Sequence, residues 1–334
     1  MATIKDVARL AGVSSGTVSN VLNRPSYVHA DTREKVLAAI RELEFVPRQG
    51  SRQFRPGRVR TLGLAIANLD NPFFVDVALG AEARCMELGV GVVICNSGYD
   101  PVHEMHNLDL LVQSRVQGII ISPVDENSAR LEMLKDRGVP MVLVDRVGDD
   151  RDCWSVVVDD VRGGQLALRR VAETGHTRIA FLGHPGTSPK VRSRLTGVES
   201  ALKDWPRARV ELIETENWTI EAGAAAGRDL VARAAGTRPT AIICANDMLA
   251  LGLQVELLRG GVRVPEDVAI VGYDDLVWAS FASVPLTTVR QPRQELGRTA
   301  VDMVMELLVR PGERRLPRSN HVVLQPELVV RDSA

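Results

Sequence analysis

From residue 61 onward, short runs of valine, isoleucine and leucine alternate with stretches that have helical character. Continuous apolar runs joined by helical crossovers are typical of parallel β-strands that are buried on both faces. This alternation limits the possible folds more than any other feature of the sequence, because a parallel sheet needs helices on both sides. The expected strands span 61–67, 91–96, 118–122, 140–145, 155–159, 178–183, 241–245 and 267–272.

Eight strands are more than one small sheet needs, so we expect an α/β fold with two doubly wound parallel-sheet subdomains. The whole unit covers residues 61–330. The first subdomain is expected to take about 61–159 plus 290–320, and the second 160–289 plus 321–330. No GxGxxG motif follows the first strand, so a dinucleotide-binding site is not supported.

The overall composition excludes several other classes of protein. The chain has 334 residues, of which 45% are hydrophobic and 25% charged, the proportions of a globular protein and not of a disordered one. The sequence contains no run of about 18 apolar residues, so a transmembrane helix is not expected. The opening residues lack the apolar core of a secretory signal. Four widely spaced cysteines predict reduced thiols: Cys85, Cys95, Cys153 and Cys244.

Charge is distributed unevenly along the chain. Residues 1–60 contain eleven Lys and Arg but five Asp and Glu, a formal charge of +6, whereas the remainder contains thirty against thirty-seven, a charge of −7. A basic head on an acidic body suggests a polyanionic partner for the head alone. A basic face that is merely solvated is an equally ordinary explanation.

The basic head begins with signals for short helices. Thr3 and Asp6 have the spacing of a capping box at the start of a first helix. Gly12 can supply the left-handed residue that ends this helix, and Ser14 is a natural N-cap for a second one.

A third helix is expected to begin at another capping box, formed by Asp31 and Glu34. Two short helices around a glycine-containing turn, supported by a third, indicate a helix-turn-helix over residues 1–46. The predicted architecture is therefore an all-α DNA-binding head, a linker over residues 47–60 and the two-subdomain body.

Specific motifs turn this general pattern into a family resemblance. The head, with TIKDVA, AGVS, TVS and VLN, resembles the DNA-binding head of the LacI/GalR family of bacterial transcription regulators. The body resembles the type I periplasmic binding-protein fold that this family carries, in NPFF, VDR, RLTGV, ANDMLALG, VAIVGYDD and PLTTVRQP. This combination is most similar to the ribose-repressor and ribose-binding-protein pattern.

The resemblance implies that the second helix lies in the major groove of DNA. Its first exposed residues, Ser15 and Gly16, can discriminate little between bases, whereas Asn20 can form two hydrogen bonds to an adenine. Hydroxyls on this helix suit phosphate contacts, or are simply solvated. The candidate DNA-binding residues are Thr3, Ser14, Ser15, Gly16, Thr17, Ser19, Asn20, Asn23, Arg52 and Phe54.

Residues 47–60 contain five arginines, two prolines and two glycines. A flexible cationic linker is one interpretation. The family resemblance instead implies a hinge helix that orders on DNA and inserts an apolar wedge into the minor groove. Phe54 stands where the family usually has leucine, and such wedges unstack and kink the duplex. Since direct base contacts look few, groove shape and this segment should supply more of the specificity.

Polar and aromatic side chains follow many of the expected strands, where ligands of doubly wound sheets bind. Sugars need planar hydrogen-bonding groups for paired hydroxyls and aromatic faces for their C–H surfaces. Phe73 and Phe74 could instead be core, and Asp145 and Asp274 structural caps. By the resemblance, the effector cleft is lined by Asn71, Phe73, Phe74, Asp145, Arg146, Arg194, Trp218, Asn246, Asp274 and Gln291.

These observations favour a sequence-specific DNA-binding transcriptional regulator, a repressor whose operator affinity is controlled by a small sugar-like effector. A pentose is the first expectation, although the family also binds hexoses, nucleosides and purines. A pseudo-palindromic operator calls for a homodimer, located in the cytoplasm on the nucleoid and without a membrane partner.

Two other classes of protein fit the sequence less well. A secreted sugar-binding protein is disfavoured by the absence of a signal sequence and by the basic head. An enzyme is disfavoured because no nucleophile elbow, phosphate loop or metal-ligand set is visible. His103 and His106 are three residues apart, with no third ligand near them in the sequence. Neither a metal nor a cofactor is therefore expected.

Overall fold

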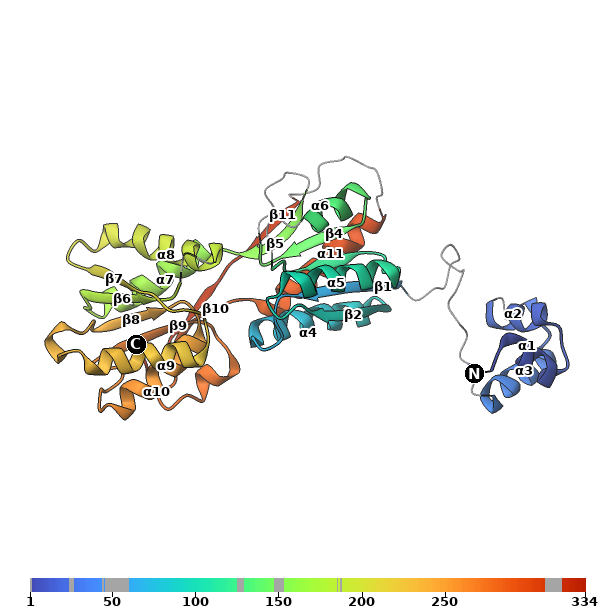
Figure 1. Cartoon of the computed structure of the whole chain (residues 1–334), viewed down its shortest axis with the longest axis horizontal. Helices are drawn as coiled ribbons and strands as arrows, with labels where there is room; N and C mark the ends of the chain where they lie inside the picture. Colours follow the sequence, from blue (N-terminus) through green and yellow to red (C-terminus); the bar gives the residue numbers. More distant parts are fainter. Residues whose placement is uncertain are drawn as a thin grey trace. The chain divides into compact units, whose positions relative to one another are not determined.

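The computed structural model divides the chain into two compact units, Met1–Arg58 and Val59–Ala334 (Figure 1). Most of the predicted linker, residues 47–59, lies outside the described part of the chain. The described residues are 2–23, 27–43, 45, 60–124, 129–146, 153–184, 186, 188–309 and 320–334.

The described residues of the first unit form three helices, as predicted: α1 (Ile4–Ala11), α2 (Ser15–Asn23) and α3 (Ala30–Glu42). Their inward faces form a small core of their own, centred on Val7, Val18, Val21, Val36 and Ala39. This core makes the head a separately packed unit.

The ends of the first two helices follow the predicted capping pattern. Thr3 and Asp6 form a reciprocal capping box at the start of α1, and Gly12 ends the helix with φ 65°. Ser14 Oγ accepts a hydrogen bond of 3.0 Å from the backbone N–H of Thr17, which caps α2.

The predicted capping box at the start of α3 is wrong. The N-cap is His29, which makes no side-chain capping bond, and Asp31 lies inside the first turn. The helix therefore begins before the predicted box. Asp31 can still stabilise α3 there, because a carboxylate in the first turn interacts favourably with the helix dipole.

The second unit contains two six-stranded sheets, and the first of them is entirely parallel. Its strand order is β11-β5-β4-β3-β1-β2. The helices α4 (Pro72–Glu87) and α11 (Arg293–Val309) pack on one face, and α5 (Pro101–Gln113) and α6 (Ala129–Asp136) pack on the other. The strands are β1 (Arg60–Ile66), β2 (Val90–Asn96), β3 (Ile119–Ile121), β4 (Met141–Val144), β5 (Trp154–Val158) and β11 (His321–Leu324).

The second sheet has the order β12-β10-β9-β8-β6-β7, and β12 runs antiparallel to β10. Its strands are β6 (Arg178–Leu182), β7 (Arg209–Ile213), β8 (Ala241–Cys244), β9 (Ala269–Asp274), β10 (Thr287–Arg290) and β12 (Glu327–Val329). The helices of this subdomain are α7 (Asp160–Glu173), α8 (Pro189–Ala201), α9 (Ile220–Ala232) and α10 (Asp247–Arg259), with the 3₁₀ turns η2 (Leu202–Asp204), η3 (Ala235–Thr237) and η4 (Val277–Ser280).

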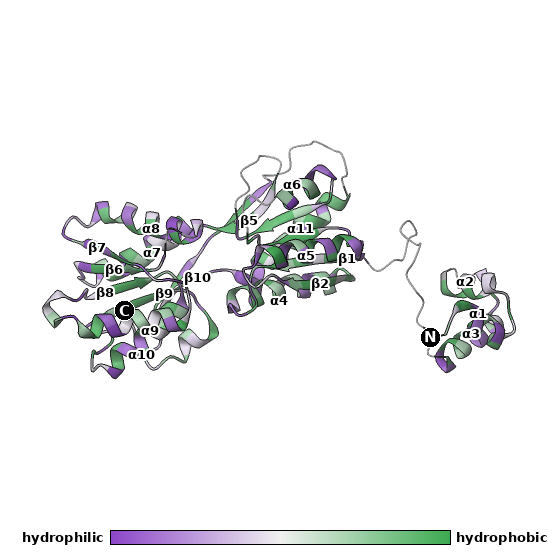
Figure 2. Cartoon of the chain, in the orientation of Figure 1, coloured by the Kyte–Doolittle hydropathy of each residue, from purple (hydrophilic) through white to green (hydrophobic). Residues whose placement is uncertain are grey.

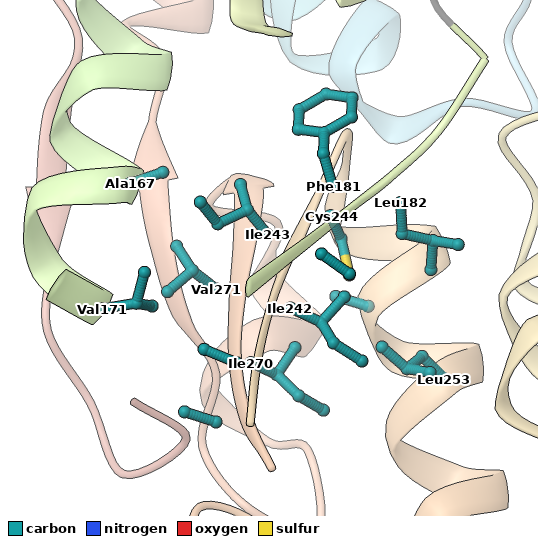
Figure 3. Close-up of a cluster of buried hydrophobic side chains, with 14 of the residues drawn as sticks. Ala167, Val171, Phe181, Leu182, Ile242, Ile243, Cys244, Leu253, Ile270 and Val271 are labelled. Atoms are coloured by element: carbon teal, nitrogen blue, oxygen red, sulfur yellow. The ribbon is translucent and has the colours of Figure 1, made fainter. Parts of the chain in front are cut away.

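Both sheets are covered on two faces by helices, which explains the continuous apolar runs in the sequence. Figure 3 shows Ala167 and Val171 of α7 on one side of the second sheet and Leu253 of α10 on the other. Figure 2 shows the central strands as mainly hydrophobic, whereas the helices contain both hydrophobic and hydrophilic residues. None of the described helices is long and apolar enough to cross a membrane.

All eight predicted strands are present, but the sequence analysis missed β7, β10, β11 and β12. Three of these, β7, β11 and β12, lie at sheet edges, where only part of the surface is buried and the apolar signal is weak. The strand β10 begins with two threonines that are fully buried, so its polar composition concealed a central strand.

The chain passes between the two subdomains three times. The first two crossings, near residues 159 and 291, are close to the predicted boundaries. The assignment of residues 321–324 to the second subdomain is wrong, because β11 pairs with β5 of the first sheet. The Ser155 hydroxyl and His321 Nδ1 are 2.8 Å apart across this pairing. The third crossing therefore lies at residues 325–326.

Candidate ligand-binding cleft

A cleft of about 660 Å³ lies between the two subdomains of the second unit, within the size range of sites for small molecules. The loops that follow the carboxyl ends of strands from both sheets form its walls. All ten residues predicted for this site line the cleft: Asn71, Phe73, Phe74, Asp145, Arg146, Arg194, Trp218, Asn246, Asp274 and Gln291.

A row of aromatic rings forms one part of the wall. The Phe73 and Phe74 rings are 5.1 Å apart edge to face, Tyr99 is 6.5 Å from Phe74, and Trp218 is 6.3 Å from Tyr99. Asn71 starts α4 by accepting a hydrogen bond of 3.0 Å from the Phe73 N–H. Both phenylalanines are 3% exposed and pack in the core, so they support the fold and line the cleft together.

Arg194 is buried and held in one orientation. Its Nε donates to Asp160 Oδ1 over 2.7 Å, and the Tyr273 hydroxyl donates to the same oxygen over 2.9 Å. The guanidinium carbon is 3.7 Å from the centroid of the Tyr273 ring. Burial alone would lower the pKa of Arg194, but Asp160, Tyr273 and Asp274 raise it above its usual range. Arg194 therefore offers a fixed positive charge.

The helices that carry Arg194 and Asp160 approach each other unusually closely. A Cβ added at Gly164 of α7 would lie 2.0 Å from the carbonyl oxygen of Arg194. Only glycine allows this separation of the two backbones, so Gly164 helps to place Arg194 against Asp160.

The Asp145 carboxylate follows β4 and is buried. Burial raises its pKa, and the Lys190 ammonium partly opposes this effect. Lys190 lies in the first turn of α8, so the ion pair between Lys190 and Asp145 joins the two subdomains across the cleft.

Asp274 ends β9 and accepts a hydrogen bond of 2.5 Å from Gln291 Nε2. Burial is the main cause that raises the pKa of Asp274, to about 6. Gln291 Oε1 and Trp218 Nε1 are buried without a hydrogen-bond partner among the described residues. Because both side chains line the cleft, a ligand could satisfy one acceptor and one donor there.

Three of the cleft residues have a left-handed backbone, with φ 58° at Tyr99, 63° at Asp145 and 113° at Asp274. Such conformations are costly for residues other than glycine, and they cluster at functional sites. The chain therefore accepts backbone strain to direct these side chains into the cleft.

Asn246 combines a structural role with its place in the cleft. Its Oδ1 caps α10 by accepting from the Leu249 N–H over 2.9 Å, and its Nδ2 donates to the Trp218 carbonyl over 3.0 Å. The adjacent Asp247 points elsewhere and accepts bonds from the Leu276 N–H and the Thr288 hydroxyl.

The cleft is also lined by residues that were not predicted for it, and Tyr99, Asp160 and Lys190 are those with the most evident chemistry. Tyr99 and Asp160 follow predicted strands, so the rule that found the other residues could also have found these two. Lys190 was harder to predict, because it lies on a helix, one turn before Arg194, and not at the carboxyl end of a strand.

The DNA-binding candidates of the head lie mostly on α2. Ser14, Ser15, Gly16 and Asn20 are exposed, and Thr17 and Ser19 are partly buried. The Thr17 and Ser14 hydroxyls are 2.9 Å apart.

The remaining DNA-binding candidates are less fully placed. Thr3 is exposed, and its hydroxyl donates to Asp6 over 2.6 Å. Asn23 ends α2, but its side chain lies outside the described part of the structure, as do Arg52 and Phe54. Among the residues that the structure describes, no group of three or more His, Cys, Asp or Glu could hold a metal.

A helix-turn-helix head joined to a two-subdomain body with a polar and aromatic cleft defines a class of ligand-responsive DNA-binding regulators. Residues 3–48 match the family of bacterial regulatory proteins of the lacI type. Residues 168–334 match the periplasmic binding protein-like domain.

Individual relatives agree with this class over the full length of the chain. The ribose operon repressor of Escherichia coli K12 is 35% identical, and the alignment covers 100% of both chains. A lac repressor dimer bound to operator and the anti-inducer ONPF has a TM-score of 0.84 at 30% identity, covering 99% of this chain and 98% of that one.

A LacI-family regulator of Enterococcus faecium with bound ribose has a TM-score of 0.73 at 26% identity, covering 82% of this chain and 98% of that one. The present chain belongs to the LacI family of bacterial transcriptional regulators. It is a DNA-binding regulator whose ligand-binding body controls the head, and not an enzyme.

Proposed function

We propose that the protein is a homodimeric repressor that binds a pseudo-palindromic operator and changes its operator affinity when a small sugar binds between the two subdomains. The observation that carries this proposal is the convergence of ten predicted residues from two sheets on one cleft. We assign effector contact to these ten residues and DNA contact to the candidates on the head and linker.

The chemistry of the cleft supports a sugar. Asp145 and Asp274 supply carboxylates for paired hydroxyls, Arg194 supplies a fixed donor, and the aromatic wall can cover C–H surfaces. The ribose bound to the Enterococcus faecium relative makes a pentose the first compound to test.

The body can control the head only if the effector binds its two conformations with different affinities. Residues at the three crossings between subdomains would absorb the change in angle. In a dimer, this change would move the two linkers together or apart and so alter the spacing of the heads.

Exposed apolar side chains support the dimer. In the first subdomain α4 and α5 each contact the edge strand β2, and they expose Met86 and Val102 by 70% and 65%. In the second subdomain, Phe281 after η4 is 82% exposed. Contiguous exposed apolar surface, but not a single exposed side chain, commonly marks protein interfaces, and the lac repressor relative was crystallised as a dimer.

We also propose that the protein acts in the cytoplasm, on the nucleoid.

The direct test is gel retardation of an operator selected from random DNA, with ribose, hexoses, nucleosides and purines added in turn. We expect retention of the full palindrome, much weaker retention of a single half-site, and a change with one class of compound. Equal retention of operator and scrambled DNA under every condition would reject the proposal.

Asn20 provides a specific prediction for the head. If Asn20 forms paired hydrogen bonds to an adenine, Asn20→Ala should reduce discrimination at one operator position by about 1–3 kcal/mol. The same assay should show a smaller effect for Ser15→Ala. Uniform weakening on all sequences would instead assign Asn20 to the phosphate backbone.

Weakening of operator binding by Phe54→Ala, with non-specific binding retained, would support the wedge.

A further inference from the structure

Lys190 is one of the cleft residues that were not predicted from the sequence, and its contacts are unusual. The residue belongs to α8 of the second subdomain, but its ammonium pairs with Asp145 of the first. The same nitrogen lies 5.5 Å from the centroid of the Phe73 ring and 5.6 Å from that of Phe74, within cation–π range. One ammonium group therefore contacts three side chains that are assigned to effector binding.

These three groups are suited to either occupant. An ammonium offers three N–H donors to a carboxylate and a positive charge to aromatic faces. A sugar offers adjacent hydroxyls to the same carboxylate and C–H groups to the same rings. Because the two occupants need the same space beside Asp145, they cannot be accommodated there together.

The burial of the two partners differs in a way that permits exchange. The Lys190 side chain is 34% exposed, whereas the Asp145 side chain is 1% exposed. Lys190 can therefore move toward solvent, but Asp145 cannot. A compound that displaces Lys190 must replace its hydrogen bonds to Asp145, since a buried polar group without a partner is costly.

We propose that Lys190 is a specificity-determining internal competitor, which fills the Asp145, Phe73 and Phe74 subsite and ties the two subdomains together until an effector with adjacent hydroxyl groups displaces it. This inference rests on the proposed effector role of the cleft. It adds that the effector competes with a side chain of the protein itself.

The first test needs no effector. Lys190→Met keeps an unbranched side chain and removes the ammonium, so the tie between subdomains is lost. Hydrogen–deuterium exchange of the full chain should then be about threefold or more faster in the first turns of α4 and α8. Lys190→Arg should restore the wild-type rates. Lys203→Met, at an exposed position outside the cleft, is the matched control.

Unchanged exchange in Lys190→Met would overturn the proposal, whatever compound proves to be the effector. If this variant does not fold because Asp145 is left buried and unpaired, Lys190→Met combined with Asp145→Asn serves for the same measurement.

The second test uses D-ribose and isothermal titration calorimetry. Loss of the competitor should tighten ribose binding to Lys190→Met about tenfold, while Lys190→Arg and Lys203→Met stay near the wild-type value. Weaker binding to Lys190→Met would mean that Lys190 holds the ligand, and would overturn the proposal. If the exchange rates change as expected but no variant binds ribose, the competitor is supported and the assignment of a pentose fails.

Discussion

Replacing Arg194 by alanine is expected to abolish the response to effector while operator binding persists. Arg194 donates to Asp160 and stacks on Tyr273 in a buried cluster that lines the cleft. The head packs around a separate core, so loss of Arg194 should not disturb the DNA-binding helices. Gel retardation with and without effector measures the response directly.

The same substitution should also lower the free energy of unfolding by about 3–5 kcal/mol, because Asp160 would keep a buried charge without its partner. Thermal or urea unfolding measures this effect. The double variant Arg194→Ala with Asp160→Ala should recover much of the stability but not the response, which separates folding from function. Arg192→Ala is a suitable control, since Arg192 is exposed on the same helix. A normal effector response in Arg194→Ala would contradict the assigned role.

The sequence was sufficient to predict the central strands and the main cleft residues because one physical rule governs both. Apolar runs identify parallel strands buried on two faces, and the carboxyl ends of such strands converge where ligands bind. Asp145, Asn246 and Asp274 lie at the carboxyl ends of predicted strands or within two residues of them, and all three line the cleft.

The rule could not predict features that depend on packing between segments distant in the sequence. Lys190 pairs with a carboxylate 45 positions earlier in the chain, and no local pattern encodes this contact. The Tyr273 hydroxyl can donate a hydrogen bond to Asp160 because β9 of the second sheet lies beside α7. The edge strand β11 was assigned to the wrong subdomain for the same reason, since only its pairing with β5 reveals its place.

Asp274 leads to a prediction with opposite consequences for ligand binding and stability. Its pKa is raised to about 6 in the folded protein, against about 3.9 for an unperturbed aspartate. A raised pKa means that the folded state binds the proton more tightly, so stability is lost as pH rises from about 4 to about 6. The loss amounts to about 3 kcal/mol above pH 7, at about 1.4 kcal/mol for each pKa unit.

Asp274→Asn should therefore be more stable than the wild type at pH 7–8, by up to about 3 kcal/mol, and the difference should vanish below about pH 4. Its amide oxygen can still accept the hydrogen bond from Gln291. Effector binding should weaken by about 10- to 100-fold, because hydrogen bonds to a charged group are the stronger ones. Urea unfolding across pH and calorimetric titration of effector measure the two effects.

The neighbouring Asp275 provides a control of opposite sign. Although burial opposes ionisation, hydrogen bonds from Arg290 and Arg331 lower the pKa of Asp275. Asp275→Asn should therefore destabilise the protein at pH 7, with the difference shrinking as pH falls below the usual range of an aspartate. If Asp274→Asn were also less stable at pH 8, the carboxylate would be part of the framework of the fold. Opposite shifts would instead show that the chain keeps a destabilising carboxylate at Asp274 because the ligand needs it.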